Sequence, residues 1–335
     1  MLSVPLQPQA QEHILLVCPP VFSYHLSIKS ELESLGHRVT WWNDRGSNST
    51  PWKIGLRLMP NLFAALLTTS FLKKLRLLQS LPVTRILVVK GEGMSLKALE
   101  ALRRQLPGAR FSLYFWDSVD NAPRAEQIMH LFDSVATFDP VDARRFGWLY
   151  RPLFARRESL TSSRPPEGFR FDWCFIGTLH SDRYRVVERL RRSSPNRKGF
   201  VFWFAPSRLL IAIRVLSDWS LWRVSDRSIS TQALPAGEVA KVSSDSRAIL
   251  DIEHPRQRGL TMRTVETLVS GRKLITTNRY IEDSDLYHPS RVHVISRDAP
   301  CVPRSFFDTP FEPLSEEIRA AYSLRRWITD LIGDR

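Results

Sequence analysis

The chain has 335 residues, with 48 Lys and Arg against 34 Asp and Glu, which gives a formal net charge of +14. Its 43% hydrophobic and 24% charged residues are typical of a globular protein, which excludes wholesale disorder, and the length suits two domains. The basic excess indicates a polyanionic partner, and charge alone leaves this as nucleic acid, an anionic membrane surface or a phosphorylated small molecule.

Cysteine usage and hydropathy exclude further classes. Cys18, Cys174 and Cys301 are isolated, with no CxxC spacing, so the sequence predicts neither a disulfide framework nor a zinc cluster. The first residues lack the pattern of a signal peptide, and no segment offers the ~20 apolar residues that cross a bilayer. We therefore expect a cytoplasmic protein, either soluble or peripheral on the inner face of the plasma membrane.

The first half of the chain alternates predicted strands and helices. His13–Cys18 is a short apolar run typical of a buried strand, Ser27–Leu35 has helical spacing before Gly36, and Val39–Trp42 is a second strand. Strand, helix and strand at this spacing form a βαβ unit and hence a parallel sheet. The pattern continues with a strand, a helix and two strands at Arg85–Val89, Ser95–Leu106, Phe111–Phe115 and Val135–Phe138.

A polar, proline-rich stretch at Arg156–Phe169 has no periodicity and marks the predicted domain boundary. A second series of strands and helices follows it, at Phe171–Ile176, Tyr184–Arg192, Ala248–Ile252, Thr261–Ser270 and Lys273–Thr277. Pro313–Ile332 reads as one closing amphipathic helix. The predicted fold class is therefore α/β, with two domains joined by a polar linker.

The most informative segment is Ser246–Asn278, in which a strand leads through a glycine loop to a helix and then to another strand. The helix places Arg263 and Glu266 on a face away from its apolar side. A helix start at the carboxyl ends of parallel strands suits a phosphate, Arg263 could contact a diphosphate, and Glu266 could accept hydrogen bonds from ribose hydroxyls. The alternative is an ordinary surface Arg–Glu pair.

This segment resembles the donor-nucleotide motif of GT-B glycosyltransferases, and more narrowly that of a bacterial group that assembles capsule, exopolysaccharide and lipopolysaccharide. Other stretches that share the resemblance are Lys90-Gly91, Tyr114–Ser118, Phe132–Ala143, Phe175–Thr178 with Arg183, and Tyr322–Leu324 with Trp327. The resemblance implies two Rossmann-like domains facing across a cleft. These would be an acceptor domain at 1–160, a donor domain at 170–312, and a C-terminal helix at 313–335 that crosses back to the first domain.

The resemblance also implies which residues bind the donor. They would line the nucleotide site from two sides: Gly177, Thr178 and Arg183 on one, and Gly259, Leu260, Thr261, Arg263 and Glu266 on the other. The broader GT-B pattern has an acidic residue seven positions before the second Glu, but this chain has Gly259 there. The resemblance therefore leaves open whether the enzyme retains or inverts the anomeric configuration.

Catalytic candidates lie in loops at the predicted carboxyl ends of the first-domain strands. Glu92, in a Lys-Gly-Glu-Gly loop, is the first candidate for the base that an inverting transfer needs, and Asp117 and Asp120 are rivals. His25, in the loop after the first strand, is a further candidate. The alternative for each carboxylate is a solvated loop residue or a helix cap, the latter especially for Asp120.

Two segments mix basic and apolar residues. Trp52–Leu81 is interpreted as an interfacial segment on an anionic inner membrane, where it would suit a lipid-linked acceptor, and the alternative is a core helix with snorkelling cations. Phe200–Arg223 has a similar composition, and we expect much of Phe200–Leu216 to be core helix. No acidic cluster has a supporting metal-ligand set, so neither a metal nor a cofactor is expected.

The sequence therefore predicts a metal-independent glycosyltransferase that uses a nucleotide-diphosphate sugar and a saccharide or lipid-linked saccharide acceptor in bacterial surface polysaccharide synthesis. A non-catalytic nucleic-acid-binding protein is the alternative that the charge of +14 keeps open, although no nucleic-acid motif supports specific binding. A dinucleotide-dependent oxidoreductase ranks last, because Pro19-Pro20 follow the first strand where a GxGxxG fingerprint would stand.

Overall fold

The structure is a computed structural model, and it describes residues 11–21, 23–46, 55, 59–78, 80–122, 125–157, 168–205, 207 and 229–333. The chain divides into two compact units, one comprising residues 1–152 with 324–335 and the other residues 153–323. These boundaries differ from the predicted ones at 160 and 312. The two ends of the second unit pair with each other, since the N–H of Ala155 donates to the carbonyl of Tyr322 (2.7 Å).

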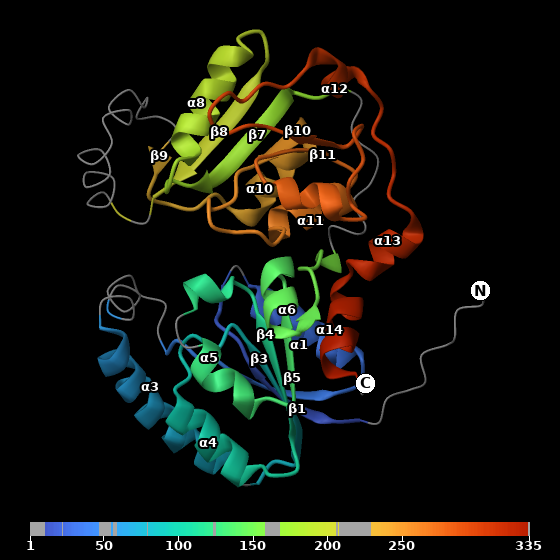
Figure 1. Ribbon diagram of the computed structural model, residues 1–335. Helices are drawn as coiled ribbons and strands as arrows, with labels where there is room; N and C mark the ends of the chain where they lie inside the picture. The colour runs from blue at the N-terminus through green and yellow to red at the C-terminus, as the bar shows by residue number, and fades with distance from the viewer. Residues whose placement is uncertain are drawn as a thin grey trace. The chain divides into compact units, whose positions relative to one another are not determined.

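The first unit is a parallel sheet with helices on both faces (Figure 1). Its strands are β1 (His13–Val17), β2 (Arg38–Trp42), β3 (Val83–Val89), β4 (Arg110–Phe115), β5 (Ser134–Thr137) and β6 (Leu149–Tyr150). Its helices are α1 (Tyr24–Ser34), α3 (Pro60–Leu75), α4 (Leu96–Gln105), α5 (Ala125–Ile128), α6 (Pro140–Phe146) and α14 (Leu324–Ile332).

Alternation along the strands of this sheet decides what each face buries. Leu15, Ile86 and Val88 belong to a core cluster with side chains of α3 and α4. In β4, Leu113 belongs to the same cluster, and the next residue, Tyr114, points to the opposite face. There the ring of Trp327 in α14 packs edge-on against Tyr114, with ring centroids 4.8 Å apart. Because both faces are covered, the strands read as nearly continuous apolar runs, which is why the sequence reveals them so clearly.

The second unit repeats this design. Its strands are β7 (Phe171–Thr178), β8 (Gly199–Phe204), β9 (Ile229–Ser230), β10 (Ser246–Asp251), β11 (Lys273–Thr276) and β12 (Val292–Val294). Its helices are α8 (Arg183–Ser193), α10 (Ala236–Ser244), α11 (Met262–Val269), α12 (Arg304–Asp308) and α13 (Glu316–Ala321). Side chains of α8 and α12 fill the core on one face of this sheet, and those of α11 fill the core on the other.

The predicted α/β class is confirmed, as are the strands and helices predicted on either side of the linker, with shifts of a few residues at their ends.

Two predictions about helices were wrong. Pro313–Ile332 is not one helix, because α13 ends at Ala321, where Tyr322 and Ser323 pair with Ala155, and α14 then starts afresh. Residues 200–204, expected as the start of a core helix, belong to strand β8, which lies between β7 and β9.

Two sequence segments lie mostly outside the described residues. These are the predicted linker, of which 158–167 are not described, and the apolar stretch 208–228. Across the described residues, no helix is both long enough and apolar enough to cross a bilayer.

Candidate functional site

The second sheet has one pair of neighbouring strands at which the strand order reverses. Its order is β12-β11-β10-β7-β8-β9, so the chain builds outward from β7 in one direction and from β10 in the other. The connections that leave β7 and β10 therefore diverge at their carboxyl ends, which is where open α/β sheets hold ligands. Gly177 and Thr178 end β7 and Asp251 ends β10, so the segment predicted from the sequence lies at this point.

A buried carboxylate fixes the start of α11 at this edge. Asp251 accepts hydrogen bonds from the hydroxyls of Thr261 (2.5 Å) and Thr264 (2.8 Å). Thr261 is also the N-cap of α11, since its Oγ1 accepts from the N–H of Thr264 (3.1 Å). The first N–H groups of a helix have no partner within it, so the positive end of α11 is held beside the carboxyl end of β10.

Two guanidinium groups lie close to this helix start. Nε of Arg183, the first residue of α8, donates to the carbonyl of Ile252 (2.6 Å). Burial, with the charges of Arg263 and Arg297, lowers the pKa of Arg183 to about 10 against the opposing charges of Asp251 and Glu253. The Arg263 side chain has no hydrogen bond or ion pair with any part of the chain that the structure describes. The edge therefore carries cationic charge that nearby carboxylates only partly offset.

Glu266 has a partner that the sequence did not reveal. Nε of Arg156 donates to its carboxylate at 2.7 Å. Burial raises the pKa of Glu266, although the charge and hydrogen bonds of Arg156 and the charge of Arg263 act in the other direction. Arg156 was assigned to the linker, but its neighbour Ala155 is pinned to Tyr322 and Ser323, which orders the backbone at this point.

A second acidic residue was also missed. Glu253, two residues after β10, contacts Arg297 at 2.5 Å and accepts from the hydroxyl of Thr277 at 2.5 Å. Arg297 also binds both carboxylate oxygens of Asp182, at 2.8 and 3.0 Å, so it joins the loops that follow three strands. Burial raises the pKa of Glu253. The only sequence signal for this network was an acidic residue directly after a buried strand.

Two of the remaining predicted donor residues are glycines that shape the backbone at this edge. A Cβ on Gly177 would lie 2.7 Å from the ring of Phe175, so this position needs glycine. The carbonyl of Gly259 accepts from the side-chain amides of Gln257 and Asn278, each at 3.2 Å, and this shapes the loop before α11. Leu260 is buried in the core under α11, so its side chain does not line the edge as the resemblance implied.

In the first sheet the order β2-β1-β3-β4-β5-β6 reverses between β1 and β3. The loop after β3 brings Glu92 and Asp117 together through Lys90, whose ammonium lies 3.2 Å from Glu92 and forms an ion pair with Asp117. Arg45 binds Glu92 from the other side at 2.5 Å. Burial disfavours the Glu92 carboxylate, but Lys90 and Arg45 together lower its pKa, which weakens it as a proton acceptor.

His25 does not lie in a loop, as the sequence suggested, but in the first turn of α1. Its ring packs at a tilt of 34° against Trp41 with ring centroids 4.6 Å apart, and burial lowers the pKa of His25. None of its contacts among the described residues is with Glu92 or Asp117. Asp120, the helix-cap candidate, lies in a short 3-10 helix after β4 and is exposed.

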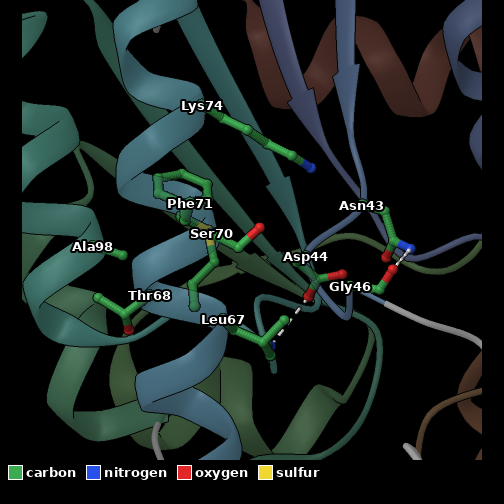
Figure 2. Close-up of a pocket in the computed structure, with 11 residues that line it drawn as sticks. Asn43, Asp44, Gly46, Leu67, Thr68, Ser70, Phe71, Lys74 and Ala98 are labelled. Carbon is green, nitrogen blue, oxygen red and sulfur yellow. Dashed lines mark hydrogen bonds between the residues drawn. The ribbon is translucent and has the colours of Figure 1, made fainter.

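The structure adds Asp44, two residues after β2, to this edge. Asp44 is only 4% exposed, and its Oδ2 accepts from the N–H of Gly93 at 3.2 Å. Burial raises the pKa of Asp44 to about 6, against the opposing hydrogen bond from Gly93 and the charge of Arg45. Asp44 lines a small cavity whose other wall is α3, with Ser70 and Lys74 on that wall (Figure 2).

Solved structures share this fold over nearly the whole chain. One is AviGT4, a glycosyltransferase of avilamycin A biosynthesis, at 14% identity, covering 96% of this chain and 99% of that one, with a TM-score of 0.55. An α-glucosyltransferase solved with UDP and a DNA 13-mer matches at 13% identity and a TM-score of 0.58, over 96% and 95%. The chain has the GT-B fold. No protein-family model and no curated protein sequence matches it.

The GT-B fold is not confined to transferases. The UDP-GlcNAc 2-epimerase of Methanocaldococcus jannaschii matches at 10% identity and a TM-score of 0.51, over 97% of this chain and all of that one. At such identities the likeness concerns the fold, and the chemistry has to be argued from side chains. In the described parts of this GT-B chain, no group of three or more His, Cys, Asp or Glu could hold a metal ion.

The buried carboxyl of Asp44 predicts a pH-dependent cost in stability. Its folded-state pKa, about 6, lies above the unfolded value of 3.8, so the native state binds more protons and this group destabilises it as pH rises through that window. We expect Asp44→Asn to raise the free energy of unfolding by up to about 3 kcal/mol above pH 7, with the difference fading below pH 4. Urea unfolding at several pH values measures this, and a difference that does not vary with pH would contradict it.

Proposed function

We propose that the protein is a glycosyltransferase that moves a sugar from a nucleoside-diphosphate sugar to a saccharide or lipid-linked saccharide acceptor in surface polysaccharide synthesis. The observation that carries the proposal is the incompletely neutralised pair Arg183 and Arg263 beside the start of α11, at the strand-order reversal of a Rossmann-like unit. A diphosphate is the ligand that two guanidinium groups and a helix N-terminus recognise together.

The same residues account for leaving-group chemistry. Breaking the bond between the sugar and the diphosphate develops negative charge on a phosphate oxygen, and preorganised donors at that oxygen lower the barrier. Arg183, Arg263 and the N–H groups at the start of α11 would supply those donors. Because these arginines and N–H groups would supply the positive charge that a divalent metal otherwise supplies, we propose that transfer needs no metal.

Glu266 is proposed to bind the ribose. Arg156 engages its Oε1, which keeps the carboxylate in one orientation and leaves acceptor capacity for a vicinal diol. The α-glucosyltransferase of the same fold was solved with UDP, which makes UDP the natural first probe.

We expect Glu266→Ala to weaken UDP binding about 10- to 100-fold, because ribose hydroxyls lose a charged hydrogen-bond acceptor. Arg263→Ala should weaken it by a similar factor through the diphosphate. Isothermal titration in buffer with EDTA measures both, with Glu282→Ala, an exposed acid of the same unit, as the matched control.

Unchanged affinity in Glu266→Ala and Arg263→Ala would contradict the assigned site. Absence of binding by the folded wild-type protein to UDP and to every other nucleoside diphosphate would overturn the proposed function. Products from UDP-glucose and UDP-GlcNAc separate the two activities found on this fold, since an epimerase returns an isomeric nucleotide-sugar whereas a transferase releases UDP.

Contact with an anionic membrane is also part of the proposal. The helix α3 exposes Leu62 (55%) and Leu66 (52%), which lie one turn apart, and Lys73 and Lys74 follow in its last turn. The stretch from Trp52 to Leu81 contains no Asp or Glu. An exposed apolar stripe beside basic residues is typical of a helix that lies in the headgroup region of an acidic bilayer.

Vesicle sedimentation tests this contact. We expect the protein to sediment with vesicles containing phosphatidylglycerol but not with pure phosphatidylcholine, and Leu62→Ser with Leu66→Ser to reduce the bound fraction several-fold. Leu26→Ser is the control, since Leu26 is an equally exposed leucine on α1. Equal binding to both kinds of vesicle, or equal loss in the control, would contradict the assignment to α3.

A further inference from the structure

The amino ends of the strands in the second sheet carry a row of basic side chains. Because the strands are paired in parallel, their amino ends share one edge, opposite the edge that carries Arg183 and Arg263. Basic residues lie at the start of four adjacent strands, β11, β10, β7 and β8, and these are Arg170, Arg197, Lys198, Arg247, Arg272 and Lys273. This amino edge therefore holds part of the positive charge that the nucleotide site does not use.

Some of these cations have partners within the unit. Arg197 binds Asp172 at 3.2 Å. The ammonium of Lys273 donates to two backbone carbonyls of α12 and its C-cap, so its charge is used inside the fold. Within the described part of the unit, neither Arg247 nor Arg272 forms an ion pair. Their charge is therefore not neutralised by a neighbouring carboxylate.

Arg272 is buried without a counter-ion. The residue is only 5% exposed, and its Nη1 is enclosed with no hydrogen-bond partner. Burial lowers the pKa of Arg272, and among the described residues no carboxylate acts against this. The ring of Phe169 lies 6.0 Å from its Cζ, a cation–π contact at the limit of its range that offsets only part of the lost hydration. Such a charge is costly to keep, which indicates that an anion binds there.

Phe169 brings a second guanidinium to the same place. Cζ of Arg247 lies 5.1 Å from the centroid of the ring that Arg272 also contacts. Because Ala248 pairs with Lys273, Arg247 and Arg272 are next to each other at the start of β10 and β11. A guanidinium over a ring spends no N–H group on it, and Arg247 uses only one, from Nη1 to a backbone carbonyl at 3.3 Å. The pair therefore keeps donors for a ligand.

Phosphate is the anion that fits this pair. The guanidinium fork binds phosphate oxygens in bidentate pairs, and a phosphate group near neutral pH carries close to two negative charges. One phosphate would thus neutralise both arginines, whereas a carboxylate would neutralise one. Phe169 is half-buried and the next residue, Arg170, is exposed, so the pair lies just beneath the surface rather than in the core.

We propose that the amino edge of the second sheet binds a phosphate group between Arg247 and Arg272. This site is separate from the nucleotide edge, and it does not depend on the proposed function. A free phosphate ion and the headgroup of phosphatidic acid share the required chemistry, and the experiments below distinguish these two sources.

Thermal unfolding in a buffer without other oxyanions, titrated with inorganic phosphate, tests the site. Phosphate should raise the melting temperature of the wild type, because it binds the folded protein. Arg247→Met and Arg272→Met should each increase the half-saturating phosphate concentration at least about 10-fold, and Arg304→Met, an exposed arginine of α12, less than about twofold. Phosphate that stabilises the wild type and both variants alike binds elsewhere, for example at the nucleotide edge, and would overturn the proposal.

The stability of Arg272→Met without phosphate gives an independent readout. Methionine removes an unpaired buried charge and keeps apolar contact with Phe169, so the variant should melt several degrees above the wild type. An arginine that only supports the fold would behave in the opposite way, and a lower melting temperature would contradict the assignment of Arg272. Arg247→Met provides the binding test if Arg272→Met does not fold.

Sedimentation with vesicles that contain phosphatidic acid identifies the source of the phosphate. The Leu62→Ser, Leu66→Ser protein is used, so that α3 does not contribute. Adding Arg272→Met should reduce the bound fraction several-fold if a lipid headgroup is the ligand, and leave it unchanged if the ligand is the free ion. Wild type that responds neither to phosphate nor to these vesicles overturns the site. No nucleotide enters either assay, so failure of the proposed function would leave these results standing.

Discussion

The site in the second unit depends on the buried carboxylate of Asp251. This group accepts the hydroxyls of Thr261 and Thr264, and so fixes the first turn of α11 to the end of β10. Without these hydrogen bonds the loop from 252 to 260 would not fix the N-terminus of α11 beside Arg183. The parallel sheet provides the edge, but a single charged side chain decides which backbone N–H groups face it.

In both units a reversal of strand order gathers charged side chains at the carboxyl edge of the sheet, but the side chains differ. In the second unit the reversal between β7 and β10 gathers arginines around a helix start, which suits an anion. In the first unit the reversal between β1 and β3 gathers Asp44, Glu92 and Asp117 with Lys90, and among the described residues Oδ1 of Asp44 has no hydrogen-bond partner. The raised pKa of Asp44 lowers native stability near neutral pH.

The sequence predicted much of this arrangement, for identifiable reasons. Buried parallel strands such as β3 and β10 are continuous apolar runs, and Thr261 before Met262 is a recognisable helix start. Contacts between residues far apart in the sequence could not be predicted. Arg156 reaches Glu266 only because Ala155 pairs with Ser323, and Asp44 looks like an ordinary loop acid until burial by α3 and Gly93 is known. The break between α13 and α14 has the same long-range cause.

The proposed function requires a nucleoside diphosphate to bind at the carboxyl edge shared by β7 and β10. Hydrogen–deuterium exchange with and without saturating UDP tests it most directly, because backbone N–H groups are among the proposed ligands. If the diphosphate binds there, exchange should be slower in peptides covering 177–183 and 259–266, with little change at 38–46 and 90–94. Unchanged exchange at 177–183 and 259–266 in UDP-saturated protein, or protection confined to the first unit, would contradict it.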